Sequence, residues 1–291
     1  MRDKNTPKYQ HGDWTSGLQS VLFLRHQLST ITKYLFSIIL VGMILCSFTS
    51  SAYAGTIAER IEQFPQWTNK PKLKLAKGDL KYPEWMAGTW SVESILTEQF
   101  APLAPDIVTP GFEDNQNYLN QAIAFEVRFG TEYETRPQGL LSRLKSSQAS
   151  VVADRGFNGQ KIAQAYLGDD NVYRVKVDPD NPNQQITFLK GDRKLISKIT
   201  GRTQETPDKN QFIATEMTQQ LFRSPERLYL NEVETTSNYQ LLDPTNISAE
   251  QITAIYLSPQ DPDYFTAGDR PVALYHYHLD LTKQNNPVNL N

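Results

Sequence analysis

Apolar and polar residues alternate along most of the chain from Gly88 onward. Between Ile123 and Phe129, every second residue is apolar and the residues between them are charged or small. A period of two is typical of a β-strand with one buried face and one exposed face. We therefore expect about ten strands, in the segments Trp90 to Gln99, Ala122 to Phe129, Val151 to Asp154, Lys161 to Leu167, Val172 to Val177, Gln185 to Leu189, Leu195 to Thr200, Gln211 to Leu221, Arg227 to Tyr239, Ile252 to Leu257 and Val272 to Leu281.

The connections between these segments are rich in turn-forming residues. Asp178-Pro179-Asp180-Asn181-Pro182-Asn183, Gly191-Asp192 and Gly201-Arg202 lie at three consecutive corners. No helical pattern long enough for a parallel crossover separates the segments, so hairpin connections are expected. A meander of this kind leaves two unpaired edges unless it closes. The pattern predicts an all-β fold, a single antiparallel β-barrel domain over residues 55–291.

A short helix is expected ahead of the strands. Thr56 can cap it, Ile57, Ile61 and Phe64 share one face, and Pro65 ends it. We interpret this helix as a strap on the barrel or a contact for a partner.

The first 54 residues have the pattern of a signal peptide. Basic residues precede an apolar run from Leu35 to Cys46, and Ala52-Tyr53-Ala54 is a small-x-small cleavage motif. An uncleaved anchor is the alternative, but the run is shorter than the roughly 20 residues that span a bilayer. Lipidation at Cys46 is disfavoured because the bulky Leu45 precedes it. The long polar stretch at the start leaves open whether the first methionine is the true start. We expect membrane contact only through this segment or at the periphery.

Charge and cysteine content exclude several classes of function. The whole chain has 29 basic and 32 acidic side chains. Cleavage after Ala54 would remove five basic and two acidic residues and leave an acidic protein. Nucleic acid is a poor partner for such a surface. Cys46, the single cysteine, would be lost as well, which excludes structural disulfides, thiolate catalysis and cysteine-ligated zinc.

Gly88-Thr89-Trp90 precedes the first long alternating run. This Gly-x-Trp pattern resembles the start of lipocalin-type barrels, in which the glycine permits a close approach and the indole plugs one end. The resemblance implies a lipocalin-like barrel in which Gly88 and Trp90 are structural. The alternative is that Trp90 is an ordinary large core residue.

Five longer stretches carry a second resemblance. They are Gly78-Asp79-Leu80-Lys81-Tyr82-Pro83, Ala101-Pro102-Leu103-Ala104-Pro105, Val108-Thr109-Pro110-Gly111-Phe112, Ala254-Ile255-Tyr256-Leu257-Ser258-Pro259-Gln260-Asp261-Pro262-Asp263-Tyr264 and Pro271-Val272-Ala273-Leu274-Tyr275. These stretches resemble an uncharacterised family of exported cyanobacterial proteins with relatives in plastids. The resemblance covers nearly all of the chain after residue 54. It implies an oxygenic phototroph as source and a location in the thylakoid lumen or periplasm, but no activity.

His276 and His278 are the clearest candidates for a metal or haem site. On a strand both imidazoles project to the same face, as in metal sites on β-barrels. The alternate positions of this strand, from Ala273 to Leu281, carry apolar side chains. We therefore expect the histidines to share the opposite, solvent-facing side with Asp280 and Thr282. If the faces were reversed, Asp280 could complete a metal or haem site.

Two acidic loops are weaker candidates. Asp178 and Asp180 begin like a calcium loop, but Pro182 replaces the next ligand, and a proline turn is favoured. Asp261 and Asp263 could act as paired carboxylates, although Asx turns explain them more simply. The sequence contains no nucleophile elbow, phosphate loop or dinucleotide fingerprint. No catalytic residue is therefore predicted, and the identity of any cofactor stays open.

The segment from Phe100 to Phe112, here called the strap, is long, apolar and rich in proline. A stiff segment of this kind suits a lid over a barrel mouth, a docking surface, or a packed loop that covers an open end. Its candidate ligand or partner contacts are Pro102, Leu103, Pro105, Ile107, Val108, Pro110 and Phe112.

Together these features predict a binding or assembly module without catalytic activity. We expect it to hold an apolar small molecule such as a pigment, lipid or quinone, or to dock on a photosynthetic-complex subunit. The alternative is a metal- or haem-dependent enzyme that uses His276 and His278.

Overall fold

The computed structural model describes residues 56–109, 111–131 and 150–284, so the expected signal peptide lies outside the described residues. The helices and short 3-10 turns are α2 (Thr56–Glu62), η2 (Glu84–Met86), η3 (Asp114–Tyr118), α5 (Arg155–Leu167), η4 (Asp169–Asn171) and α6 (Tyr264–Ala267). The strands are β1 (Lys74–Leu75), β2 (Gly88–Phe100), β3 (Ala122–Thr131), β4 (Val151–Ala153), β5 (Val172–Val177), β6 (Gln184–Leu189), β7 (Arg193–Glu205), β8 (Gln211–Arg223), β9 (Leu228–Asp243), β10 (Asn246–Leu257) and β11 (Ala273–Lys283).

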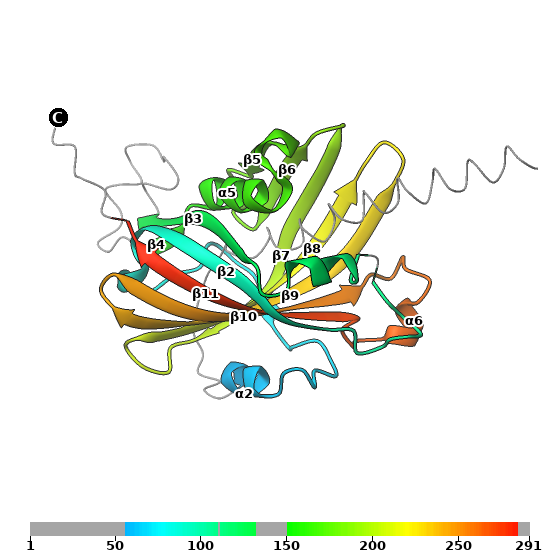
Figure 1. The fold of residues 1–291 in the computed structure, drawn as a ribbon, viewed down its shortest axis with the longest axis horizontal. Helices are drawn as coiled ribbons and strands as arrows, with labels where there is room; N and C mark the ends of the chain where they lie inside the picture. Colours follow the sequence, from blue (N-terminus) through cyan, green and yellow to red (C-terminus); the bar gives the residue numbers. More distant parts are fainter. Residues whose placement is uncertain (1–55, 110, 132–149, 285–291) are drawn as a thin grey trace, which may run out of the picture.

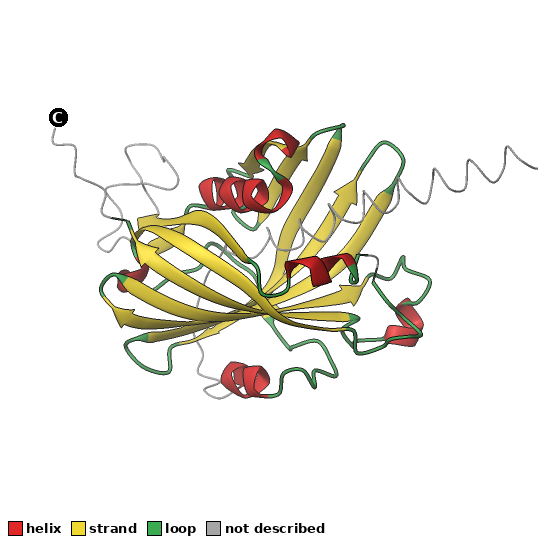
Figure 2. Ribbon diagram, in the orientation of Figure 1, coloured by secondary structure: helices red, strands yellow, loops and turns green. Residues whose placement is uncertain are grey.

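The described strands form one antiparallel sheet in the order β4-β3-β2-β11-β10-β9-β8-β7-β6-β5, with β1 added to β7. The sheet is strongly curled, and strands dominate the molecule (Figures 1 and 2). The predicted all-β antiparallel fold of about ten strands with a short N-terminal helix is therefore confirmed. Its form is a half-barrel, because β4 and β5 are the two ends of the described strand order and are not paired with each other.

A helix, α5, connects these two ends. It follows β4, leads through η4 into β5, and contacts both β3 and β5. The prediction of a strand over Lys161 to Leu167 is wrong, because these residues form the second half of α5. The Asp154 side chain accepts a hydrogen bond from the Phe157 amide at 3.1 Å and caps the helix. The helix ends at Gly168, whose φ is +83°.

The apolar residues of α5 explain why a helix forms there. The buried residues Ile162, Ala163 and Leu167 recur at helical spacing and face the sheet. The helix also lies very close to β5, because a Cβ built on Gly159 would be 3.1 Å from a methyl carbon of Val175. Glycine is therefore favoured at this position, and α5 can cover the open side of the half-barrel.

The inner face of the sheet carries the main apolar core. Tyr82 links its two walls, with ring centroids 4.8 Å from Phe129 on β3 and 5.5 Å from Phe212 on β8. Trp90 and Phe222 are also fully buried in this cluster. Aromatic packing across the interior thus holds the two walls of the curled sheet together.

The outer face of β8 to β11 is covered by α2 and the segment that follows it. Trp67 packs there against Met217, Ile252 and Tyr256. The expected apolar face of α2 contributes, with Ile57 fully buried and Ile61 packed against the same cluster. In the structure α2 lies over the outer face of the sheet.

Candidate functional site

Four polar side chains lie side by side across the inner face of β6 to β9. The strand register pairs Gln185 with Ser197, Ser197 with Gln220, and Gln220 with Asn231. Paired residues of neighbouring antiparallel strands point to the same face of a sheet. We call this set of four residues the polar row.

The polar row lies in the protein core. Gln185, Ser197, Gln220 and Asn231 are exposed by only 5%, 4%, 4% and 3%. Each has a polar atom without a hydrogen-bond partner in the described structure: both amide atoms of Gln185, Ser197 Oγ, Gln220 Nε2 and Asn231 Oδ1. Nearly all buried polar atoms in proteins find a partner, so five unpaired atoms on four neighbouring side chains need an explanation.

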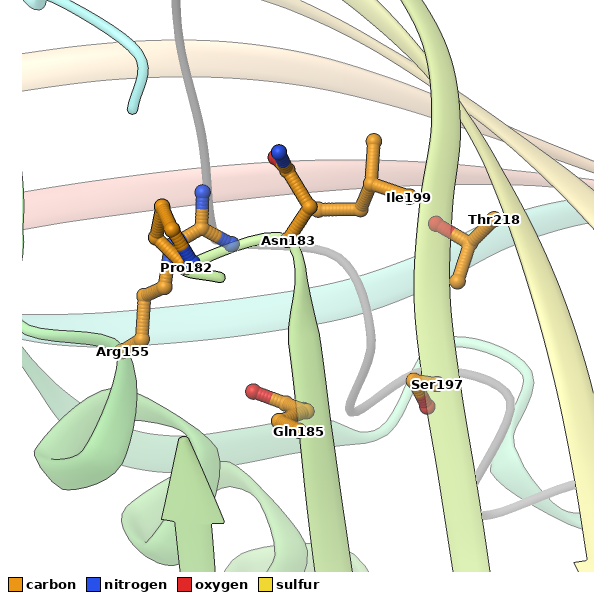
Figure 3. Close-up of a pocket in the computed structure, with 7 residues that line it drawn as sticks. All are labelled: Arg155, Pro182, Asn183, Gln185, Ser197, Ile199 and Thr218. Atoms are coloured by element: carbon orange, nitrogen blue, oxygen red, sulfur yellow. The ribbon is translucent and has the colours of Figure 1, made fainter. Parts of the chain in front are cut away.

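A small cavity lies at the β6 end of the polar row. Its volume is about 10 Å³, which is room for roughly one water molecule. Figure 3 shows Arg155 reaching from the start of α5 towards Pro182 and Asn183, with Gln185 and Ser197 on neighbouring strands. Ile199 and Thr218 complete the lining. The cavity shows that protein atoms do not fill all of the space beside this end of the polar row.

Two buried ion pairs lie next to this cavity. Arg155 Nε is 2.8 Å from Asp79 Oδ1, and Arg202 Nε is 2.9 Å from Glu216 Oε1. Arg202 also donates to Asn183 Oδ1 at 2.6 Å. Burial raises the pKa of Glu216 to about 7, although the positive charges of Arg202 and Arg155 oppose the shift. Burial lowers the pKa of Arg155. Two cations and two anions therefore leave this part of the interior balanced in charge when Glu216 is ionised.

The arrangement is suited to hydrogen bonding more than to bond breaking. Amides and hydroxyls face the cavity, and the nearby carboxylates are held by arginines. In the described parts of the chain, no group of three or more His, Cys, Asp or Glu side chains is arranged to hold a metal ion. At the β6 end, the polar row places unpaired hydrogen-bonding atoms of Gln185 and Ser197 beside this cavity.

Sequence reasoning missed the polar row, although a signal was present. Gln220 is two residues before the buried Phe222, in phase with the apolar face of its strand. Alternation predicts an apolar residue there. Polar residues at inward positions on several strands would have indicated a site inside the sheet.

Gly88 and Trp90 lie where β2 meets the end of β11. Trp90 is completely buried and donates from Nε1 to the Met86 carbonyl at 2.8 Å. Lys283 Nζ lies 5.1 Å from the centre of the Trp90 ring. A Cβ on Gly88, whose φ is +128°, would be 2.8 Å from Lys283 Cε, so the site requires glycine. Both residues are placed to pack this part of the core.

The strap follows β2 and folds back over the core. Ile107 and Phe112 are buried, and the ring centre of Phe112 is 5.9 Å from that of Tyr275. Leu103 packs against the same cluster. The other candidates point elsewhere: Pro102 and Pro105 are exposed, Val108 is 44% exposed, and Pro110 lies outside the described residues. The strap thus combines a packed inner side with an exposed outer side.

His276 and His278 lie on the outer face of β11, half-buried, with Asp280 and Thr282 beyond them. Glu250 on β10 bridges them, 2.9 Å from His276 Nε2 and 2.7 Å from His278 Nδ1. Side-chain hydrogen bonds to Glu250 raise the pKa of both histidines. Their other ring nitrogens face carboxylates too, with Glu98 3.4 Å from His276 and Asp280 3.3 Å from His278. The two imidazoles form an ion-pair ladder on the sheet surface.

The two acidic loops contain Asx turns. Asp261 Oδ1 accepts from the Asp263 amide at 2.9 Å, and Asp178 Oδ1 accepts from the Asp180 amide at 2.9 Å. Their carboxylates thus hold the backbone of each loop.

In the part of the chain that is described, no helix is long and apolar enough to cross a membrane.

The fold and interior define an antiparallel half-barrel with a polar row in its core. Residues 74–285 match the family described as Domain of unknown function (DUF6816), and the chain belongs to that family. No curated protein and no solved structure matches the chain.

Proposed function

We propose that this protein is a non-catalytic binding module that holds a small molecule against the inner face of its half-barrel. The observation that supports this function best is the polar row, with unpaired polar atoms on four adjacent strands inside the core. Leaving a buried donor or acceptor unpaired costs about 1 to 3 kcal/mol. A bound molecule or ordered water that pairs with the row would remove that cost.

The alternative, a metal- or haem-dependent enzyme centred on His276 and His278, has weaker support. Every ring nitrogen of the pair faces a carboxylate, and Glu250 lies between the two rings. A metal would have to displace at least part of this ladder. Metal analysis and an absorption spectrum of the purified protein test this alternative directly.

The proposal includes export to the thylakoid lumen or periplasm of an oxygenic phototroph. Its support is the apolar run from Leu35 to Cys46 followed by Ala52-Tyr53-Ala54, together with the resemblance to exported cyanobacterial proteins. The exposed side of the strap, with Val108, would be free to contact a photosynthetic-complex subunit. If the full chain is expressed in a cyanobacterium, the recovered protein should begin at Gly55. A mature protein that retains residues 1–54 would contradict export by cleavage.

The binding function is tested on this recovered protein. Native mass spectrometry should detect a co-purified small molecule that is released by organic solvent. The variant Gln220→Leu should carry less of it, whereas Gln219→Leu, an exposed neighbour on the other face of β8, should carry as much as the wild type. If the wild type carries no such molecule, the proposed function is wrong.

A further inference from the structure

We infer that a small organic anion with an apolar tail binds in a cavity on the outer face of the sheet. The cavity has a volume of about 570 Å³ and lies between α2, residues 69–74 and the strands β7 and β8. We call residues 69–74 the lysine segment. Figure 1 shows α2 on the side of the sheet opposite α5, so this cavity is separate from the polar row on the inner face. Binding there would be a property beyond the proposed function.

The size of this cavity points to an organic molecule. Sites for small molecules commonly enclose roughly 300 to 1,000 Å³. The space beside the polar row is about 10 Å³, whereas the outer cavity has about 570 Å³. An inorganic ion would fill only a small part of the outer cavity.

The lysine segment is held at both ends by the chain itself. At its start, Arg60 of α2 donates to the Asn69 carbonyl at 2.8 Å. At its end, Lys74 is the first residue of β1, which pairs with β7. A Cβ built on Gly201 of β7 would be 2.9 Å from Leu73 Cβ, so glycine lets the segment lie directly against the strand. A pre-formed site avoids the cost of ordering its walls when a ligand binds.

The charged side chains that line the cavity are mostly basic. Glu59 is the acidic side chain in the described lining. The basic ones are Arg60, Lys70, Lys72 and Lys74. This excess stands in a chain that has 29 basic and 32 acidic side chains overall. A cleft lined by one sign of charge attracts ligands of the opposite sign, so the cavity favours anions.

Two of these cations are available to a ligand. Arg60 and Lys70 lie 2.6 and 2.7 Å from glutamates of β9 and are neutralised by them. Lys72 and Lys74 are exposed, and their side chains have no partner in the part of the chain that the structure describes. Their ammonium groups can therefore donate charge-assisted hydrogen bonds to a carboxylate, sulfonate or phosphate.

Both walls of the cavity also carry apolar side chains. Ile57 contributes from α2, and Pro71 and Leu73 alternate with the lysines of the lysine segment. The lysine stems add further methylene groups. Between the walls, Thr203 of β7 pairs with Thr215 of β8 and supplies a floor of small side chains. A molecule with one anionic end and an apolar tail matches this combination.

Octanoate, 1-octanol, octylammonium and acetate separate the effect of charge from that of apolar burial. The first three share an eight-carbon chain and differ in charge, and acetate keeps the carboxylate without the tail. Each is titrated into the recovered protein after dialysis, and binding is measured by calorimetry at low and high salt. We expect octanoate to bind at least about fivefold more tightly than each other probe. Added salt should weaken octanoate binding and leave 1-octanol binding unchanged.

Variants of the lining locate the site. Lys72→Gln and Lys74→Gln should each weaken octanoate binding by about threefold and leave 1-octanol binding unchanged. The matched control, Lys198→Gln, removes an exposed charge of β7 that does not line the cavity, and should bind octanoate as the wild type does. Thr203→Tyr would fill the floor and should abolish binding of both probes. If Thr203→Tyr does not fold, the lysine variants carry the test.

The results that would overturn this inference differ from those that bear on the polar row. Octanoate binding no tighter than 1-octanol or acetate, or unchanged when Lys72→Gln and Lys74→Gln are combined, overturns it. Binding to phosphatidylglycerol vesicles without binding of soluble octanoate also overturns it, because the lysines would then contact a membrane surface. Gln220→Leu lies on the inner face and should leave octanoate binding unchanged, so the proposed function and this inference fail independently.

Discussion

The two faces of strands β8 to β10 bury polar groups in opposite ways. On the outer face, Glu234 is 0% exposed and accepts hydrogen bonds from Arg60 at 2.6 and 2.8 Å and from Tyr256 at 2.6 Å. On the inner face, three residues earlier on the same strand, Asn231 Oδ1 has no partner in the described structure. The outer groups are matched by the protein itself, and those of the polar row are not.

This difference distinguishes polar groups that the chain itself pairs from polar groups that are unpaired in the described structure. The outer network attaches the N-terminal segment, because Arg60 of α2 also lies 4.0 Å from the centre of the Trp67 ring. Its partners are all supplied by this chain, so it needs no ligand. The polar row is incomplete by the same criterion. His276 and His278 resemble the outer network in this respect, because carboxylates of this chain face all of their ring nitrogens.

The strongest test of the matched outer network is Glu234→Ala. Removal of this carboxylate leaves Arg60, whose side chain is 13% exposed, without its partner. We expect a loss of about 3 to 5 kcal/mol in the free energy of unfolding. Urea denaturation measures it. Glu232→Ala removes the more exposed Lys70 pair on the same strand and should cost about 1 kcal/mol or less. Equal losses in the two variants would show that the Arg60 network is not specially stabilising.

The pH dependence of stability tests whether burial raises the pKa of Glu216. Its pKa in the folded state is raised to about 7 from 4.5, so the folded protein binds the proton more tightly than the unfolded chain. Stability from this group is greatest below pH 4.5 and is lost as pH rises to about 7, by on the order of 3 kcal/mol. We expect the stability of the wild type relative to Glu216→Gln to fall over that range. A difference that is constant with pH, in urea unfolding, would contradict the shift.

An apolar replacement in the polar row should change the free energy of unfolding in the opposite direction to Glu234→Ala. Gln220→Leu removes an amide that is buried without a full set of partners in the described structure. We expect the ligand-free protein to be unchanged or more stable by up to about 1 to 2 kcal/mol. Gln219→Leu should change stability by no more than about 0.5 kcal/mol. A large loss in Gln220→Leu would place its amide among the structural groups.

The smallest expected effect concerns the histidine ladder. Hydrogen bonds to Glu250 raise the pKa of His278, so their stabilisation is complete below the unfolded pKa of about 6.5 and is lost as pH rises through the folded value. His278→Ala should cost on the order of 0.5 kcal/mol at pH 5.5 and less at pH 8.5. Thermal unfolding at the two pH values measures this. A larger cost at pH 8.5 would mean that the ring acts through packing instead of charge.

Much of the sheet was predictable because many of its strands have one exposed face and one buried face. The alternation gave most strands correctly, and the antiparallel arrangement followed from the short turns. The error at Lys161 to Leu167 has a physical cause. Ile162, Ala163 and Leu167 fit a helical face, and the capping residue Asp154 had been assigned to the preceding strand.

The candidate site was less predictable, because it depends on which strands become neighbours. Gln185 and Asn231 are 46 positions apart in the sequence and share a row only through the register of β6 to β9. The ladder at His276 likewise depends on Glu98 and Glu250 from other strands. The solvent face of the histidines, in contrast, followed from local alternation alone.

The position of β11 has a consequence for how the chain folds. This strand, the last one in the described part of the chain, lies between β2 and β10, near the middle of the sheet. A chain that ended before Ala273 would leave two separate sheets, each with an exposed edge where β11 belongs. The sheet can therefore assemble only after the final strand has been synthesised, and the contacts it makes with β2 close a loop of more than 170 residues. Until then, the β2 and β10 edges are where incomplete chains would be most prone to associate with one another.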